Sequence, residues 1–317
     1  MGQIEAEGDG AIETEPHGVL YCDGSYIERR MNGFPSDDHH TSWNTVRFSL
    51  AGLEVLLRSP DDALANLSPS YAAQGAARDT PDLVLEIRRV VGLGAGAPRP
   101  PRYPEFARSR TTGGAIRLHR PDATGEVALP LSPAEPVRGS FVVGESRHSL
   151  DAVLRASVSI AVPRNGGLIL HASAVDARGA AYVFSGVSGA GKSTIATLLG
   201  GLPGFTKIAD DLVIVMPHAG GFALHTVPFL CKEARPPRHG LPGAGGHALA
   251  QRPAHRRERL APAAATRELL RHVLAHVVEP QTAASTLAAA LAFTTVVPCH
   301  RLEFARAASV VDVLDIT

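Results

Sequence analysis

Cysteine is scarce in this chain of 317 residues, and neither sign of charge is in excess. The 31 basic residues balance 31 acidic ones, so no long-range field attracts the protein to nucleic acid or to an anionic membrane. Cys22, Cys231 and Cys299 are odd in number and far apart, which argues against a disulfide framework and a paired-cysteine metal site. We expect small buried thiols in a protein of a reducing compartment.

We also expect neither a secretory signal nor a membrane span. The first sixteen residues hold five acidic residues, no basic residue and no apolar core, so we expect residues 1–16 to be a disordered acidic tail. Gln281–Cys299 carries no charge, but it is mostly Ala and Thr, which favours a buried Ala-rich helix over a transmembrane one. We therefore expect a soluble, cytoplasmic protein with no nucleic-acid or membrane partner.

Lysine is rare as well, and it occurs only at Lys192, Lys207 and Lys232. The first lies in a glycine-rich run that matches the pattern GxxxxGK[ST]. Glycines let the backbone curl so that N–H groups face phosphate oxygens, and a following helix N-terminus adds to the anion site. Lys192 can reach the β- and γ-phosphates, and the Ser193 hydroxyl can bind Mg²⁺. The run predicts a site for a nucleoside triphosphate with Mg²⁺, taken to be ATP, formed by Gly186, Val187, Ser188, Gly189, Ala190, Gly191, Lys192, Ser193 and Thr194.

Residue patterns divide the rest of the chain near residue 148. We expect residues 17–147 to form a β-rich, antiparallel α+β domain without a chemical site, because short alternating runs are separated by turn residues. A helix is expected to start at 59–62, and a hairpin is expected to turn at Gly113–Gly114. The predicted strands of this half are 46–50, 53–57, 83–87, 126–131 and 140–143.

Residues 148–317 follow a different pattern, in which a strand precedes the glycine-rich loop and a helix and a strand follow it. This order is typical of a P-loop α/β domain. The predicted strands are 168–175, 181–185, 212–216, 222–229 and 300–304, and the predicted helices are 149–162, 192–199, 266–278 and 281–294.

Three more residues become candidates when these segments are taken together. A histidine that ends an apolar strand, such as His171, is usually structural, and adjacent acids such as Asp210 and Asp211 are usually turn residues. In a P-loop domain, however, the strand that carries metal-directed acids lies beside the loop strand, so both acids should approach Mg²⁺ and the γ-phosphate. One could bind the metal, and the other could accept the proton of an attacking hydroxyl.

The run from His171 through the loop to Asp211 resembles the catalytic domain of bacterial HPr kinase/phosphorylase. It is more narrowly similar to HPr-kinase-like proteins of peptide-modifying gene clusters, including lasso-peptide kinases. His171 precedes Lys192 by 21 residues, the family's spacing, and Asp211 follows it by 19, one more than in true HPr kinases. The resemblance implies the α/β P-loop fold shared with phosphoenolpyruvate carboxykinase. It also implies that Asp211 is the general base, that His171 supports it, that Lys192 binds phosphate and that Ser193 binds Mg²⁺.

Beyond Val215 the resemblance weakens. Glu233 stands two residues before Arg235, as a metal-directed Glu does in HPr kinases, although the neighbouring residues differ. Glu233 is thus a candidate second Mg²⁺ ligand, with an ordinary loop charge as the alternative. The phosphorylase reaction stays open. The amino-terminal half looks like the β-rich region that precedes the kinase core in the HPr-kinase-like group. HPr kinases form oligomers, but the sequence identifies no interface.

A basic segment runs from 232 to 262, and its richness in Pro, Gly and Ala predicts a mobile loop. Seven Lys and Arg face two acidic residues, and no aromatic residue is interleaved, which disfavours a platform for single-stranded nucleic acid. It is either a solvated linker, or a lid or docking surface for an acidic peptide. In the second case it would supply an arginine to the transition state, with Arg256 and Arg257 as the first candidates.

The leading functional hypothesis is an ATP-dependent kinase that transfers the γ-phosphate to a hydroxyl, expected to be a serine of a peptide or small protein. The resemblance adds peptide tailoring as the setting. A kinase acting on a small metabolite is an alternative, because the fold does not fix the acceptor. A nucleotide-binding regulatory protein with little turnover is another. His171, Asp210 and Asp211 favour a kinase, because a protein that only binds a nucleotide needs none of them.

Overall fold

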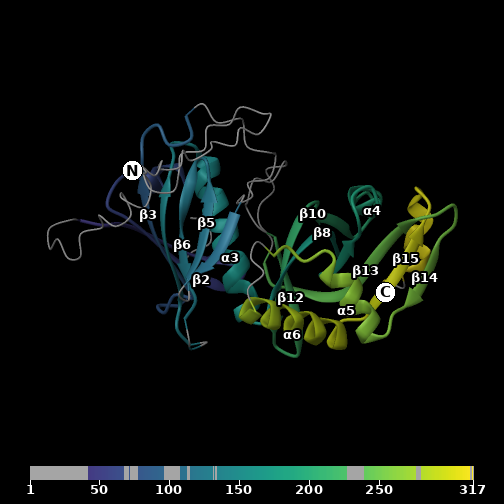
Figure 1. Cartoon of the computed structure of the whole chain (residues 1–317). Helices are drawn as coiled ribbons and strands as arrows, with labels where there is room; N and C mark the ends of the chain where they lie inside the picture. Colours follow the sequence, from purple (N-terminus) through teal and green to yellow (C-terminus); the bar gives the residue numbers. More distant parts are fainter. Residues whose placement is uncertain are drawn as a thin grey trace, which may run out of the picture. The chain divides into compact units, whose positions relative to one another are not determined.

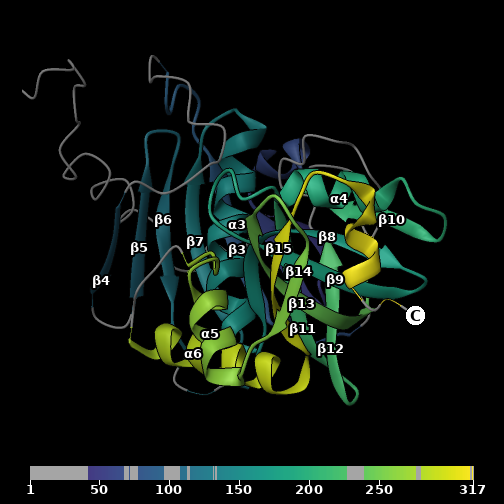
Figure 2. The same ribbon diagram turned by 90° about the vertical axis from the view of Figure 1, so that its right-hand side faces the viewer.

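The computed structural model describes residues 42–67, 71, 78–95, 108–112, 115–130, 132, 134–226, 239–275, 280–314 and 316. Trp43–Thr317 forms one compact unit, while the other unit, Met1–Ser42, lies outside the described residues apart from Ser42. The acidic tail predicted at residues 1–16 is therefore outside them too. The described unit is a mixed α/β structure with two sheets and few helices (Figure 1 and Figure 2).

The first sheet has seven strands in the order β1-β2-β3-β7-β6-β5-β4. We expected an antiparallel sheet, but β3 runs parallel to both of its neighbours, β2 and β7. Long connections on either side of β3 replace the hairpins that an antiparallel sheet would need. The helix expected at 59–62 is a short 3-10 turn, η1 (Ala63–Asn66). The strands are β1 (Asn44–Leu50), β2 (Leu53–Ser59), β3 (Leu83–Arg89), β4 (Arg108–Thr112), β5 (Ala115–Arg120), β6 (Ala123–Ala128) and β7 (Val137–Val143).

Helix α3 (Arg147–Arg164) confirms the helix expected at 149–162 and joins the two sheets. The Ser146 side chain caps it by accepting a hydrogen bond from the His148 N–H, and Gly166, with φ 74°, follows its end. Every residue from Ser149 to Pro163 is buried, because the helix packs against strands on more than one side. One hydrophobic core includes Leu154 and Ile160 of α3, Phe48 and Phe141 of the first sheet, and Ile169 and Ile214 of the second.

The second sheet has the order β10-β8-β11-β12-β13-β15-β14, and β9 pairs with both β8 and β13. Its strands at 168, 180, 212, 221 and 299 were expected, whereas β10, β13 and β14 were not. The strands are β8 (Leu168–Ala177), β9 (Ala180–Ser185), β10 (Phe205–Ala209), β11 (Leu212–His218), β12 (Gly221–Thr226), β13 (Leu241–Gln251), β14 (Arg256–Arg259) and β15 (Cys299–Phe304).

Different helices cover the two faces of this sheet (Figure 1). Helices α5 (Pro262–Leu270) and α6 (Pro280–Val296) pack on one face, where Leu269 and Phe293 enter the core. Helix α4 (Lys192–Gly200) and the 3-10 segment η2 (Ala308–Val313) pack on the other face, where Ile195 and Val310 join Phe304. The start of α4 is thereby fixed against the ends of the central strands.

Two expectations for the carboxyl-terminal part were wrong. The segment 232–262 is not one long loop, because β13 and β14 form within its described part. The helix expected at 266–278 begins at Pro262 and ends at Leu270, after which Val273 pairs with Leu170.

The helix expected at 281–294 is α6, but only one side of it is buried. On its outer side Leu287, Leu291 and Val296 are about half exposed. Among the helices in the described ranges, none is both long and apolar enough to cross a membrane.

Candidate functional site

The glycine-rich loop connects the end of β9 to the start of α4, as the sequence predicted. Gly191 has φ 94°, and a Cβ added there would lie 2.6 Å from both the Gln251 side-chain nitrogen and the Phe304 ring. A Cβ on Gly186 would lie 2.8 Å from the Cβ of Ala190. Glycine is therefore favoured at Gly191 by its backbone conformation and by close packing, and at Gly186 by close packing alone. Its middle residues, Val187, Ser188 and Gly189, are exposed.

Lys192 is folded back onto this loop. Its side chain is buried, and Nζ donates hydrogen bonds to the carbonyl oxygens of Gly186 at 2.8 Å and Val187 at 3.3 Å. The hydroxyl of Ser173 on β8 donates to the Lys192 carbonyl oxygen at 2.8 Å, which fastens the start of α4 to the sheet. Burial lowers the pKa of Lys192, and the negative charge of Asp211 acts in the opposite direction. The ammonium group and the Asp211 carboxylate are thus within electrostatic range.

His171 and Asp211 meet in the structure. Leu212 pairs with His171 across β8 and β11, and the Ala172 N–H donates to the Asp211 carbonyl oxygen at 3.0 Å. His171 Nδ1 lies 3.1 Å from Asp211 Oδ1, and the two side chains are 45% and 32% exposed. The paired backbone therefore holds an imidazole and a carboxylate together where both side chains are partly exposed.

The neighbouring strand is not the one we predicted. We expected the strand that follows the acid pair to lie beside the loop strand β9, but β11 pairs with β8 and β12. Strand β8 is ten residues long, and it pairs with β11 through its first half and with β9 through its second half. The long strand between them brings the acid and the loop together.

The Asp210 side chain contacts a lysine rather than the histidine. Its Oδ2 accepts a hydrogen bond from Lys207 Nζ on β10 at 2.8 Å, so the two predicted acids have different partners. Its predicted role as a metal ligand stays a prediction. Glu233, the other predicted carboxylate ligand, lies outside the described residues.

No cage for a metal is formed by three or more His, Cys, Asp or Glu side chains within the described ranges. Mg²⁺ needs no such cage when it binds with a nucleotide, because one or two protein oxygens suffice and phosphate and water oxygens complete its shell. The exposed Ser193 hydroxyl and the part-exposed Asp210 carboxylate are oxygen donors of this kind. The described side chains therefore fit a magnesium–nucleotide complex.

His272 is a neighbour of the site that sequence reasoning missed. The His171 N–H donates to the His272 carbonyl oxygen at 2.7 Å, in the stretch after α5 that pairs with β8. Its side chain is buried, and burial lowers its pKa, with a further contribution from the positive charge of Lys192. No signal in the sequence marked it, because the stretch was expected to be helical.

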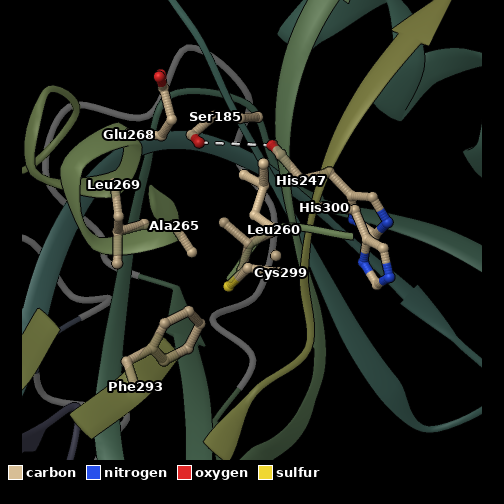
Figure 3. Close-up of a pocket in the computed structure, with 12 residues that line it drawn as sticks. Ser185, His247, Leu260, Ala265, Glu268, Leu269, Phe293, Cys299 and His300 are labelled. Carbon is tan, nitrogen blue, oxygen red and sulfur yellow. Dashed lines mark hydrogen bonds between the residues drawn. The ribbon is translucent and has the colours of Figure 1, made fainter. Parts of the chain in front are cut away.

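A pocket lies under the sheet, between β13 and β15 on one side and α5 and α6 on the other (Figure 3). Its lining is mostly apolar, and the rings of His247 and His300 point away from it, toward the opposite face of the sheet. Cys299 lines it as a buried free thiol, and burial raises the pKa of this thiol to about 11. The cavity is a packing gap rather than a reactive site. Cys22 and Cys231 lie outside the described residues.

Arg256 and Arg257, the arginines predicted to act in the transition state, lie away from the glycine-rich loop. Arg256 and Arg257 are on β14, which β13 and β15 separate from the loop strand β9. Arg257 donates to the Val313 carbonyl oxygen at 3.3 Å and contacts His300, so its contacts are with the η2 side of the sheet.

Comparison with models of known protein families gave no match, and comparison with curated protein sequences gave none either.

Proposed function

We propose that this protein is an ATP-dependent kinase with a P-loop core of the HPr-kinase type, which transfers the γ-phosphate to a hydroxyl. The expected acceptor is a serine of a peptide or small protein, and the expected location is the cytoplasm. The observation that carries the proposal is the contact of 3.1 Å between His171 and Asp211, made within electrostatic range of Lys192 at the glycine-rich loop. A nucleotide-binding protein without turnover would have no use for this pair.

The loop and Lys192 would supply the phosphate site. The Lys192 ammonium now contacts the two carbonyl oxygens of Gly186 and Val187, and phosphate oxygens would take their place. The N–H groups at the start of α4 face the same region and favour an anion. Buried, pre-positioned positive charge is an effective way to stabilise the charge that develops during phosphoryl transfer.

Asp211 would act on the acceptor. Asp211 Oδ1 lies 3.1 Å from His171 Nδ1, which leaves the second carboxylate oxygen for the acceptor hydroxyl. That oxygen would take the hydroxyl proton as the phosphoryl group moves in line. His171 fixes the direction of the carboxylate, and the backbone pairing of β8 and β11 fixes both residues.

Mg²⁺ would be held by the Ser193 hydroxyl and a carboxylate, and when bound it supplies charge neutralisation at the phosphates. Asp211 is close to Lys192, whereas Asp210 is engaged with Lys207. Since Asp211 is assigned to the acceptor hydroxyl, Asp210 is the described carboxylate proposed for the metal.

The proposal is tested by incubating the protein with ATP, Mg²⁺ and serine-containing peptides encoded by neighbouring genes, followed by mass spectrometry. We expect one peptide to gain the mass of one phosphate with the wild type and not with Lys192→Met. Lys207→Met is the matched control, because it removes the other described lysine, and it should leave transfer measurable. If wild-type protein consumes ATP but modifies no peptide, the acceptor is a metabolite. If it neither binds nor consumes ATP, the proposal is wrong.

A further inference from the structure

Three parallel strands end beside the glycine-rich loop. Strands β9 and β13 are parallel with Ser185 opposite Ala248, and β13 and β15 are parallel with Gln251 opposite Phe304. Strand β13 therefore continues for three residues beyond the end of β9 and runs alongside the loop, where Leu249 lies 3.4 Å from a Cβ built on Gly186. Ligands of α/β sheets bind at the carboxyl ends of parallel strands.

Arg306 is connected to the loop through one side chain. The Gln251 amide nitrogen lies 2.6 Å from a Cβ built on Gly191, so the amide packs directly on the loop at the first residue before α4. The Gln251 amide oxygen accepts a hydrogen bond from the guanidinium of Arg306 at 3.4 Å. Arg306 itself is exposed. The planar Arg306 guanidinium therefore lies near the loop, and its hydrogen bond to the packed Gln251 amide orients it.

The two turns that follow β13 and β15 form one surface. The Arg252 N–H donates to the Phe304 carbonyl oxygen at 3.0 Å. His255 Nδ1 accepts from the Ala305 N–H at 3.3 Å, and His255 Nε2 lies 3.1 Å from the Ser309 hydroxyl. These contacts hold the turn that carries Arg306 against the end of β13. The guanidinium is therefore presented from a fixed backbone.

The direction of a bound nucleotide follows from the strand order. His171 on β8 and Asp211, which directly precedes β11, lie on the β8 side of β9, and Gln251 and Arg306 lie at the ends of β13 and β15 on its other side. Transfer to an acceptor at Asp211 requires the γ-phosphate to face the first side. The nucleoside must then extend toward the second side.

We propose that Arg306, oriented by Gln251, contacts the base of the bound nucleoside triphosphate. The inference rests on the proposed nucleotide site at the loop. A guanidinium is planar and weakly hydrated, and it stacks on aromatic faces, which suits it to a purine base. No contact of Arg306 with the triphosphate is part of the proposal, because the loop and Lys192 already occupy that position.

Calorimetric titrations with Mg²⁺-ATP and with Mg²⁺-tripolyphosphate separate base contact from phosphate contact. Arg306→Ala should weaken ATP binding by about tenfold, the size expected of a stacked cation, and should leave tripolyphosphate binding within about twofold of wild type. Gln251→Ala should show the same pattern with a smaller loss, because it frees the guanidinium without removing it. Arg301→Ala is the control, since Arg301 is also exposed on β15 but pairs with Glu268 of α5.

Equal losses for both ligands in Arg306→Ala would place the guanidinium on phosphate and overturn the inference. Unchanged ATP binding in a folded Arg306→Ala protein would also overturn it. Wild-type protein that binds neither ligand would contradict the nucleotide site itself, and the inference would fall with it. Circular dichroism and a thermal melt of each variant establish that it is folded.

Discussion

His171 Nδ1 lies 3.1 Å from Asp211 Oδ1, and the strand pairing that places Leu212 opposite His171 also holds the Ala172 N–H on the Asp211 carbonyl oxygen. The histidine therefore contacts the carboxylate rather than the phosphate site. Its proposed task is to direct the carboxylate.

Replacement of His171 tests that task. His171→Ala should lower the rate of phosphate transfer by roughly 10- to 100-fold, because a free carboxylate is less well placed to accept a proton. His171→Asn should recover part of the rate, because its amide NH₂ can donate from nearly the same position as Nδ1. The dissociation constant for Mg²⁺-ATP should stay within about twofold in both variants. Loss of ATP binding in parallel with the rate would instead show a structural role.

The two left-handed glycines of the loop provide a matched pair. Gly189→Ala has open space around the new methyl group, so it should cost only about 1–2 kcal/mol of unfolding free energy, for the positive φ of 82°. Gly191→Ala has a similar φ but adds close contacts with Gln251 and Phe304, and it should cost roughly 2–4 kcal/mol. Urea denaturation measures both. Equal losses would mean that the packing of Gly191 contributes nothing.

Buried histidines make the stability depend on pH. Burial lowers the pKa of His247 to about 3, and the charges of His300 and Arg257 act in the same direction. Burial lowers the pKa of His225 to about 4. Both values lie below the ordinary 6.5, so between pH 6.5 and about 4 the unfolded chain binds more protons than the folded one. The free energy of unfolding should therefore fall as the pH is lowered through this window.

The contribution of His247 is measured by urea denaturation at several pH values between 7.5 and 5. In His247→Gln the decline should be shallower by up to about 1.4 kcal/mol per pH unit, the limit for one titrating group. His148→Gln, which alters an exposed histidine at the start of α3, should keep the wild-type slope. A wild-type slope in His247→Gln would show that the buried ring is not the source.

The parts of the site that could be predicted depend on local signals. The strand before the loop, the glycine-rich run and the helix that begins at Lys192 are contiguous, and each is marked by its own residues. The pairing of His171 with Asp211 could be anticipated only because a resemblance associated them. The neighbours of the strand that follows Asp211 depend on long-range pairing. The prediction placed this strand, β11, beside β9, whereas it pairs with β8 and β12.

Strand β13 shows why other parts could not be predicted. Its sequence, LPGAGGHALAQ, is rich in residues that ordinarily disfavour strands, and it was expected to be a loop. In the structure β9 and β15 flank it, and side chains crowd its glycines. A Cβ on Gly245 would lie 3.0 Å from the Tyr182 ring, and one on Gly246 would lie 3.0 Å from Cys299 Sγ. Glycine at these positions permits close packing, which the sequence alone does not reveal.

Phosphate transfer by Asp211→Asn is the most direct test of the central claim. The amide is isosteric with the carboxylate but cannot accept the hydroxyl proton in its place. We predict that Asp211→Asn keeps the wild-type dissociation constant for Mg²⁺-ATP within a few-fold while the rate of transfer falls by at least about 100-fold, the usual size of general-base catalysis. Asp176→Asn, which alters an acid near the end of β8 that accepts a hydrogen bond from the Gly179 N–H, is the control and should transfer normally. An unchanged rate in Asp211→Asn would contradict the account.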